Sequence, residues 1–299
     1  MYWGINVSNS YRMMNIIEHV YVIIPMYNAE NTICTAIESV LSQIGVEIEV
    51  VVVDHGSNDR SLLSVINEYG DDERVKVYPL TRGKKEKKSA ARPLNYGIEQ
   101  VMKMSKGCDK CWFVRLDADD KFVSDVSLIT LIKYKNEKCR VLGGAMFFYN
   151  SSTKKSQLYT NKSQYDSIED MLGGVAYVYA HHATLISTQL LEIINKDNGK
   201  FFDEKLCYGE DLDFSLKILS CCKDEQVIFT HIPIILKETV GETITNTIKL
   251  RTLLHDHIRI FVRHKSLSKI LFVKLVIWLI ADRVLKNNKL ISPVKKYLG

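Results

Sequence analysis

The chain lacks several features that mark special classes of protein. Its 299 residues contain no internal repeat and no low-complexity segment, and a composition of 46% hydrophobic and 25% charged residues excludes the disordered and collagen-like classes. Residues 1–18 mix polar and apolar side chains without the apolar core of a secretory signal. The length allows one large α/β domain with additions, or two small domains.

Regularly spaced cysteine pairs are also missing. The seven cysteines are odd in number, and their spacing shows no disulfide framework. Cys108 and Cys111 form a lone C-x-x-C without a second pair, which argues against a zinc site. We therefore expect reduced cysteines and a cytoplasmic protein.

Positive charge is concentrated at the C-terminal end. Between Lys249 and Gly299 twelve Lys and Arg residues face only Asp256 and Asp282, although the net charge of the whole chain is +5. The body is therefore mildly acidic and the tail strongly basic. Such a tail suggests contact with an anionic surface, either a membrane or a nucleic acid.

Two helices are expected in this tail, Thr243–His264 and Leu267–Leu285. The longest apolar run of the second, Leu275–Ala281, is far shorter than the roughly 20 residues that a bilayer span needs. This helix either packs on the body or lies in a membrane interface with Trp278 as an anchor. We favour peripheral attachment to the inner face of the membrane, because the surrounding charge is basic.

Apolar strands alternate with helices in the first part of the chain. The expected strands are Val20–Pro25, Glu47–Asp54, Arg74–Pro79 and Cys111–Leu116, and the expected helices are Ala29–Gln43, Asp59–Tyr69 and Ala90–Met104. This alternation predicts a parallel sheet with right-handed crossovers. Ligands of such sheets bind beyond the carboxyl ends of the strands, where Asp54 and Asp117 lie.

The later part of the chain has a less regular pattern. Expected here are helices at Val126–Tyr134, Ser167–Leu172 and Gly209–Ser220, strands at Arg140–Tyr149 and Thr184–Ser187, and a pair of strands within Gln226–Leu236 that Pro233 interrupts.

An acidic cluster follows the fourth expected strand, at Asp117, Asp119 and Asp120. Carboxylate oxygens suit hard divalent cations such as Mg²⁺ or Mn²⁺. A metal ion held there can neutralise a diphosphate leaving group. A solvated acidic turn that caps a helix gives the same pattern, so the cluster by itself leaves both interpretations open.

Motifs in a fixed order accompany the cluster. They are Pro25-Met26-Tyr27-Asn28, Val53–Asp59, Ala90-Ala91-Arg92, Leu116–Asp120, Phe202-Asp203-Glu204 and Gly209-Glu210-Asp211. The series resembles family 2 of the GT-A-fold glycosyltransferases. The resemblance implies an α/β GT-A fold, with a mostly parallel central sheet, flanking helices and a C-terminal helical extension. It divides the chain into an N-terminal extension (1–19), a glycosyltransferase domain (20–240) and a basic, partly apolar extension (241–299).

The resemblance also implies a nucleotide site. Pro25, Tyr27, Asn28 and Asp54 take the places that hold the base and ribose in the family, because a carboxylate can accept the uracil imide N–H and Tyr27 offers a face for stacking. A simple turn at Tyr27-Asn28 is the alternative. His55 stands where the family has a second acid, which leaves the nucleotide open.

The diphosphate end is implied in the same way. Arg92 takes the place of an arginine that approaches the diphosphate, and its planar fork suits phosphate; a surface arginine bonded to nearby acids is the alternative. Asp119 and Asp120 carry Mn²⁺ or Mg²⁺ and the diphosphate, while Asp117 braces the cluster or contacts the ribose.

Asp211 is implied to be the catalytic base, with Glu210 as its neighbour. An inverting enzyme needs a carboxylate that removes the acceptor hydroxyl proton opposite the leaving diphosphate. An acidic pair that stabilises the N-terminus of a helix would look the same in the sequence. His181, His182 and His231 have no clear assignment: the first two could contact a sugar, and the third could supply a metal ligand.

These features predict an inverting, metal-dependent glycosyltransferase. It would move a hexosyl or N-acetylhexosaminyl group from a nucleotide-diphosphate donor, with a UDP-sugar favoured, to a hydroxyl of a glycan or lipid-linked glycan in surface polysaccharide synthesis. One alternative is a sugar-1-phosphate nucleotidyltransferase, whose Gly-rich phosphate loop is missing from Pro25–Ala29. Another is a non-catalytic glycan- or nucleotide-binding protein, although the combination of Asp211 with the acidic cluster argues against it. Nucleic-acid binding through the tail is not favoured.

Overall fold

The computed structural model describes residues 17–83, 89–159, 181–198, 200–239 and 250–264. These residues form one nine-stranded sheet made of β1 (His19–Met26), β2 (Glu47–Asp54), β3 (Val75–Pro79), β4 (Cys111–Arg115), β5 (Asp120–Phe122), β6 (Val141–Asn150), β7 (Lys155–Tyr159), β8 (Thr184–Ser187) and β9 (Val227–Thr239). The helices are α1 (Ile33–Leu41), α2 (Ser61–Tyr69), α3 (Ala91–Met104), α4 (Ser127–Ile132), α6 (Thr188–Asn198), α7 (Glu210–Ser220) and α8 (Leu250–Arg263), with 3₁₀ turns η2 (His181–Ala183) and η3 (Asp224–Gln226).

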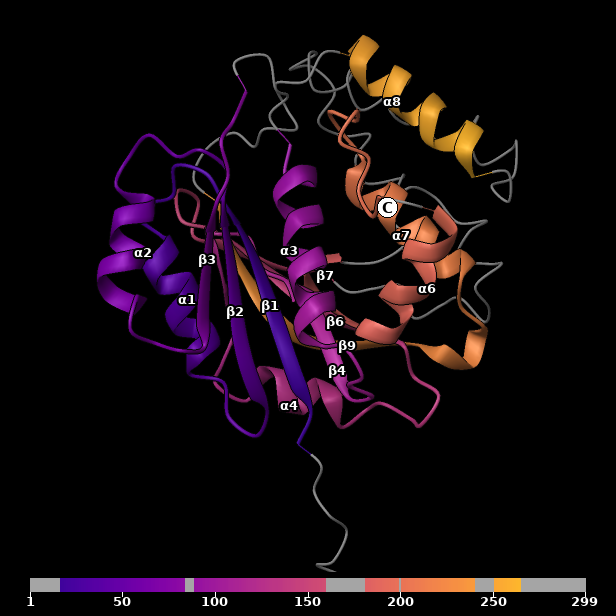
Figure 1. Ribbon diagram of the computed structural model, residues 1–299, viewed down its shortest axis with the longest axis horizontal. Helices are drawn as coiled ribbons and strands as arrows, with labels where there is room; N and C mark the ends of the chain where they lie inside the picture. The colour runs from indigo at the N-terminus through magenta and orange to yellow at the C-terminus, as the bar shows by residue number, and fades with distance from the viewer. Residues whose placement is uncertain (1–16, 84–88, 160–180, 199, 240–249, 265–299) are drawn as a thin grey trace, which may run out of the picture.

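The sheet has the strand order β3-β2-β1-β4-β8-β6-β9-β5, and β7 pairs with β6 beside this path. Both faces of the sheet are covered, because successive side chains of a strand point to opposite sides. Val22 and Ile24 of β1 pack on the side of α1, α2 and α4, whereas Tyr21 and Ile23 pack on the side of α3, α6 and α7. The result is a three-layer α/β domain (Figure 1).

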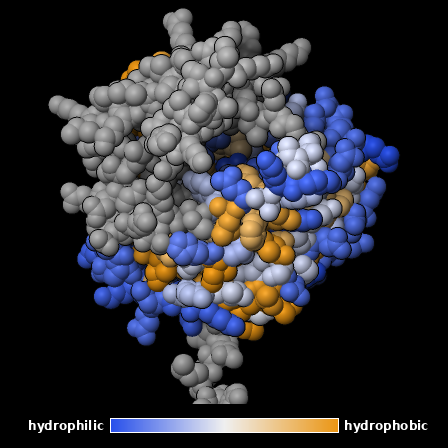
Figure 2. Space-filling view, turned by 180° about the vertical axis from the view of Figure 1, so that it is seen from behind, coloured by the Kyte–Doolittle hydropathy of each residue, from blue (hydrophilic) through white to orange (hydrophobic). Residues whose placement is uncertain are grey.

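The first half of the sheet confirms the expected parallel arrangement. β3, β2, β1 and β4 pair in parallel, and β2 has the predicted bounds. The carboxyl ends of β1 and β2 lie at the top of Figure 1, and the view from behind shows a hollow at this end of the molecule (Figure 2). The strand ends therefore deliver their following residues to one edge of the sheet.

The second half of the sheet mixes orientations. β4 pairs antiparallel with β8, and β8 pairs antiparallel with β6, while β6 and β9 run parallel. The predicted interruption at Pro233 is wrong, because β9 is one strand with an irregular register opposite Gly143 and Ala145. Proline has no N–H to donate to the ladder, and the register shifts lie on both sides of the Ala145–Pro233 pair. Nearby, Thr230 Oγ1 donates to the Gly143 carbonyl at 3.1 Å. The short β5, the exposed β7 and helix α6 had no counterpart in the sequence prediction.

Some expected segments lie outside the described residues. These are the basic run Lys84–Lys88, the helices Ser167–Leu172 and Leu267–Leu285, and residues 243–249 of the helix predicted at Thr243–His264. Among the helices that are described, none is both long and apolar enough to cross a membrane.

One cysteine pair corrects the expectation of reduced cysteines throughout. Cys108 and Cys111 form a disulfide in the turn between α3 and β4. The turn is tight, with the Cys108 N–H donating to the Ser105 carbonyl at 2.9 Å. It brings the two Cα atoms to 5.7 Å, a normal separation for a disulfide. The other five cysteines are not disulfide-bonded: Cys34, Cys139, Cys207, Cys221 and Cys222.

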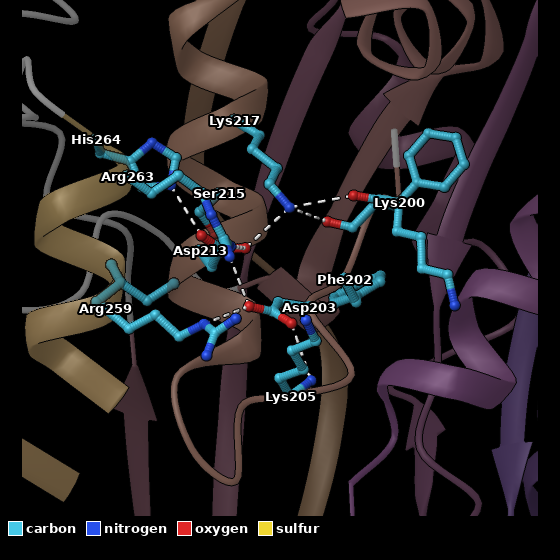
Figure 3. Close-up of polar contacts among 12 residues, drawn as sticks. Lys200, Phe202, Asp203, Lys205, Asp213, Ser215, Lys217, Arg259, Arg263 and His264 are labelled. Atoms are coloured by element: carbon cyan, nitrogen blue, oxygen red, sulfur yellow. Dashed lines mark hydrogen bonds and ion pairs between the residues drawn. The ribbon is translucent and has the colours of Figure 1, made fainter. Parts of the chain in front are cut away.

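Helix α8 is held against the body by buried acids. Asp213 of α7 is fully buried and accepts from Lys217 Nζ at 2.9 Å, Arg263 Nη1 at 2.6 Å and His264 Nε2 at 2.9 Å (Figure 3). Beside it, Asp203 accepts from Arg259 Nε at 3.0 Å. An uncompensated buried carboxylate would be costly, so these cations are what allow Asp213 to be buried.

A third acid ties α8 to the loop that precedes α7. Asp256 is buried and its Oδ2 accepts the backbone N–H groups of Cys207 at 2.8 Å and Tyr208 at 3.1 Å. Ile260 of the same helix packs on Leu206 and Leu216. Asp256 and Ile260 therefore hold α8 on the body together with Arg259 and Arg263, which bind Asp203 and Asp213.

Candidate active site

The acidic cluster lies at the carboxyl edge of β4. Asp117 follows this strand closely, and Asp120 opens β5 directly after the exposed Asp119. One carboxylate oxygen from each of the three residues lies within 4.8 Å of the others. A set of three converging carboxylates fits a hard divalent cation.

Three basic side chains surround the cluster. Arg115 Nε donates to Asp117 Oδ1 at 2.8 Å, and His182 Nε2 lies 3.2 Å from Asp117 Oδ2. Lys237 Nζ lies 3.1 Å from Asp120 Oδ2 and 3.4 Å from Asp117 Oδ2. The sequence reasoning missed Arg115 and Lys237. An arginine inside a buried strand, directly before acids, was the available signal for Arg115, since a buried charge needs a partner.

The pKa values of the neighbouring Asp117 and Asp120 are shifted in opposite directions. Burial would raise the pKa of Asp117, but the charges of Arg115, His182 and Lys237 hold it well below its usual range. Burial and the nearby Asp117 carboxylate raise the pKa of Asp120 to about 7. Asp117 is therefore the permanent anion of the pair.

The second acidic pair stands at the N-terminus of α7. Gly209 precedes it with a φ of 78°, a conformation that favours glycine, and Glu210 and Asp211 form the first turn. Burial and the Asp211 carboxylate raise the pKa of Glu210 to about 7. Asp211 Oδ1 accepts the N–H of Leu212 at 2.8 Å.

Arg115 connects the two acidic groups. Burial lowers the pKa of its guanidinium, but the carboxylates of Asp117, Glu210 and Asp211 raise it by more. The structure thus brings Asp117 and the Glu210–Asp211 pair to the same buried arginine, although about 90 residues of sequence separate them. A site that gathers two acidic groups around one buried cation can serve a reaction in which one group supports a leaving group and the other accepts a proton.

The predicted nucleotide residues form a second group at the same edge. Asp54 ends β2 opposite Met26, beside Pro25, and its carboxylate accepts the backbone N–H of Ser57 at 3.2 Å. Asn28 has a left-handed φ of 51°, and its Oδ1 accepts the N–H of Asn58 at 2.9 Å. The loops after β1 and β2 are therefore fastened to each other.

Tyr27 and Arg92 have contacts that the sequence did not predict. The Arg82 guanidinium lies 4.5 Å from the centroid of the half-exposed Tyr27 ring, a cation–π contact that covers one face of the ring. Arg92 Nη1 donates to the Thr81 carbonyl at 3.0 Å, which ties the start of α3 to the loop after β3. His55 is buried, and its backbone N–H donates to the Met26 carbonyl at 2.8 Å.

This arrangement defines a class of protein. The first half of the sheet is parallel, and the loops at its carboxyl edge are bonded to each other. An acidic cluster and a sheet half of mixed orientation follow. This is the GT-A fold of nucleotide-sugar transferases. The chain belongs to glycosyl transferase family 2, whose model matches residues 21–194.

Curated relatives agree with the family. An uncharacterized glycosyltransferase of Haemophilus influenzae is 34% identical over 213 residues, which cover 70% of this chain and 75% of that protein. The uncharacterized glycosyltransferase RT0329 of Rickettsia typhi is 28% identical, with coverages of 76% and 66%. The minor teichoic acid biosynthesis protein GgaA of Bacillus subtilis is 30% identical, and the match covers 66% of this chain and 42% of GgaA. The chain thus spans about two thirds or less of the length of two of these relatives.

Solved structures share the fold. TarS 1-349 of S. aureus, in complex with UDP-GlcNAc, has a TM-score of 0.58 and 17% identity, covering 94% of this chain and 76% of TarS 1-349. The mannosyltransferase PcManGT of Pyrobaculum calidifontis, in complex with GDP-Man and Mn²⁺, has a TM-score of 0.56 and 16% identity, with coverages of 90% and 70%. At such identities the likeness shows the fold alone.

Proposed function

We propose that the protein is an inverting, metal-dependent glycosyltransferase that moves a hexosyl or N-acetylhexosaminyl group from a nucleoside diphosphate to a hydroxyl of a glycan or lipid-linked glycan. The observation that carries the proposal is that the buried Arg115 donates to Asp117 of the acidic cluster and also interacts with the Glu210–Asp211 pair. The relation to a teichoic acid biosynthesis protein supports a setting in surface polysaccharide assembly.

The donor would bind at the carboxyl edge of β1, β2 and β4. Tyr27 and Asp54 suit a pyrimidine base and its imide, and a structural neighbour binds UDP-GlcNAc, so we favour a UDP-sugar. Pro25 and Asn28 shape this pocket, and Arg92 approaches the diphosphate. His55 is the residue on which this nucleotide preference depends.

The acidic cluster would hold the diphosphate end of the donor. Asp119 and Asp120 are the proposed ligands of Mn²⁺ or Mg²⁺, and Asp117 braces them through Arg115 or contacts the ribose. A bound divalent ion would supply positive charge to the diphosphate as its bond to the sugar breaks. PcManGT, with Mn²⁺ in its complex, supports this choice of cofactor.

Asp211 would remove the proton of the acceptor hydroxyl. In-line attack on the anomeric carbon requires a base opposite the diphosphate, and the Asp211 carboxylate interacts with the same buried Arg115 as the acidic cluster. Glu210 has a pKa raised to about 7, so near neutrality it carries a proton for much of the time. Arg115 balances the carboxylates of both acidic groups.

Asp119→Asn is expected to weaken Mn²⁺-dependent UDP binding by about 10-fold or more, because one of the three carboxylates is lost. Calorimetric titration of UDP and GDP with Mn²⁺ and with EDTA measures the effect. Asp125→Asn is the matched control, since this exposed acid lies a few residues further along the chain. If Asp119→Asn bound both nucleotides as tightly as the wild type, the metal assignment would be wrong.

The basic C-terminal extension would attach the enzyme to an anionic membrane surface, where lipid-linked acceptors are found. The proposal rests on the sequence, which has eight Lys and Arg residues against Asp282 between 265 and 299. Removal of residues 267–299 should reduce sedimentation with anionic liposomes by about 10-fold or more, since each basic residue near such a surface contributes roughly 1 kcal/mol. Equal sedimentation of both forms would refute the attachment.

A further inference from the structure

Lys237 inserts a positive charge into the acidic cluster from a distant strand. In the antiparallel pairing of β5 with β9, Asp120 lies directly opposite Lys237. The ammonium group lies 3.2 Å from Asp120 Oδ1, 3.1 Å from Asp120 Oδ2 and 3.4 Å from Asp117 Oδ2. The backbone pairing therefore holds this cation between two of the three carboxylates that would bind a metal ion.

Burial makes this contact more than a surface ion pair. The side chain of Lys237 is 21% exposed, and that of Asp120 is fully buried. Solvent can screen the ammonium from the carboxylates only weakly, so its charge acts strongly on any other cation that approaches the same oxygens. Asp119 is the exposed member of the cluster.

Lys237 and a metal ion would compete for the same oxygens. A divalent ion bound to Asp119 and Asp120 would lie close to the ammonium, because the ammonium contacts both oxygens of Asp120, so the ion must either displace the lysine or bear the repulsion. The diphosphate of a donor supplies negative oxygens that can complete the shell of the ion and also accept from a displaced ammonium. The metal ion is thus favoured when it arrives together with a diphosphate.

We propose that Lys237 is a positioning residue that keeps the cluster from binding free divalent ions and makes metal binding depend on the nucleotide diphosphate. This inference rests on the proposed function, because it takes the cluster as the metal–diphosphate site. Without a nucleotide, the lysine holds Asp117 and Asp120 in place. With a nucleotide diphosphate, its ammonium moves toward the phosphate oxygens and releases the carboxylates.

Titration with Mn²⁺, followed by the electron paramagnetic resonance of the free ion, tests the proposal without any catalytic readout. Lys237→Met should bind Mn²⁺ alone at least 10-fold more tightly than the wild type. Lys237→Arg should bind it as weakly as the wild type, because the positive charge is kept. An unchanged or weaker affinity of Lys237→Met would overturn the proposal.

The wild type provides a second test that needs no variant. It should bind Mn²⁺ at least 10-fold more tightly with saturating UDP than without, and UDP should show the same gain with Mn²⁺ because the coupling is reciprocal. In Lys237→Met this coupling should shrink several-fold. If the wild type bound Mn²⁺ equally well with and without UDP, the role of Lys237 would be refuted.

The two hypotheses fail in different ways. If the wild type bound no Mn²⁺ even with UDP, the metal-dependent function would fail and the inference with it. If the wild type bound Mn²⁺ with UDP through Asp119, but Lys237→Met bound free Mn²⁺ no more tightly than the wild type, only the role of Lys237 would fail.

Discussion

Asp211→Asn is expected to lower kcat by about 1,000-fold, which lies within the range that general-base catalysis contributes. The amide has nearly the shape of the carboxylate but cannot accept the acceptor proton at neutral pH. Donor affinity should stay within about twofold of the wild type, because Asp211 is not among the residues proposed to contact the donor. Steady-state transfer assays and calorimetry with the same donor measure the two effects.

Glu210→Gln is the matched control for this substitution. It removes a neighbouring carboxyl of the same helix turn, whose pKa is raised to about 7, so near neutrality it removes only part of a charge. We expect a loss in kcat at least about 10-fold smaller than that of Asp211→Asn, since Glu210 does not take the proton. Near-normal turnover by Asp211→Asn would show that another group is the base.

Asp213→Asn is expected to lower the free energy of unfolding by about 3–5 kcal/mol, the usual cost of removing one partner of a buried ion pair. Asp213 is fully buried and Lys217 is 5% exposed, so the variant leaves a buried ammonium without its carboxylate. Arg263 and His264 of the α8 segment lose the same partner (Figure 3). Urea denaturation of the variant and of the exposed control Asp125→Asn measures the difference; a loss below about 1 kcal/mol would contradict the importance of this cluster.

The same cluster predicts a dependence of stability on pH. Burial would raise the pKa of Asp213, but His264, Lys217 and Arg263 hold it at about 2, below its ordinary value of 3.8. A lowered carboxyl pKa stabilises the folded state above the ordinary value, by about 2–3 kcal/mol for a shift of this size. That stability is lost as the pH falls from about 4 toward 2. The difference in the free energy of unfolding between the wild type and Asp213→Asn should therefore become smaller over this pH range.

Local sequence patterns were sufficient to predict the parallel half of the fold and the position of the acidic cluster. The run Glu47–Asp54 is apolar and β-branched with an acid at its end, and the strand has those bounds. Asp117 could be placed at the edge of the sheet because the apolar run before it carries no turn residue. The structure buries Cys111–Arg115 throughout, as expected of such a strand. In both cases the information lies within a few neighbouring residues.

The cations around the cluster could not be predicted in this way. Lys237 reaches Asp120 through the pairing of the three-residue β5 with a strand 117 residues later, and neither the length of β5 nor its register is visible in a local pattern. The Cys108–Cys111 disulfide spans only three residues, and it was missed because the C-x-x-C stands alone without a second cysteine pair. Long-range pairing, which single-sequence patterns do not encode, decides the position of Lys237.

Incubation of the protein with Mn²⁺ and a panel of UDP- and GDP-sugars, followed by ³¹P NMR of the products, tests the proposed reaction most directly. We expect release of a nucleoside diphosphate, with UDP favoured, and no release from Asp119→Asn under the same conditions. Release of pyrophosphate would indicate nucleotidyl transfer instead. A wild-type protein that neither binds nor turns over any donor of the panel would contradict an enzymatic role for the site.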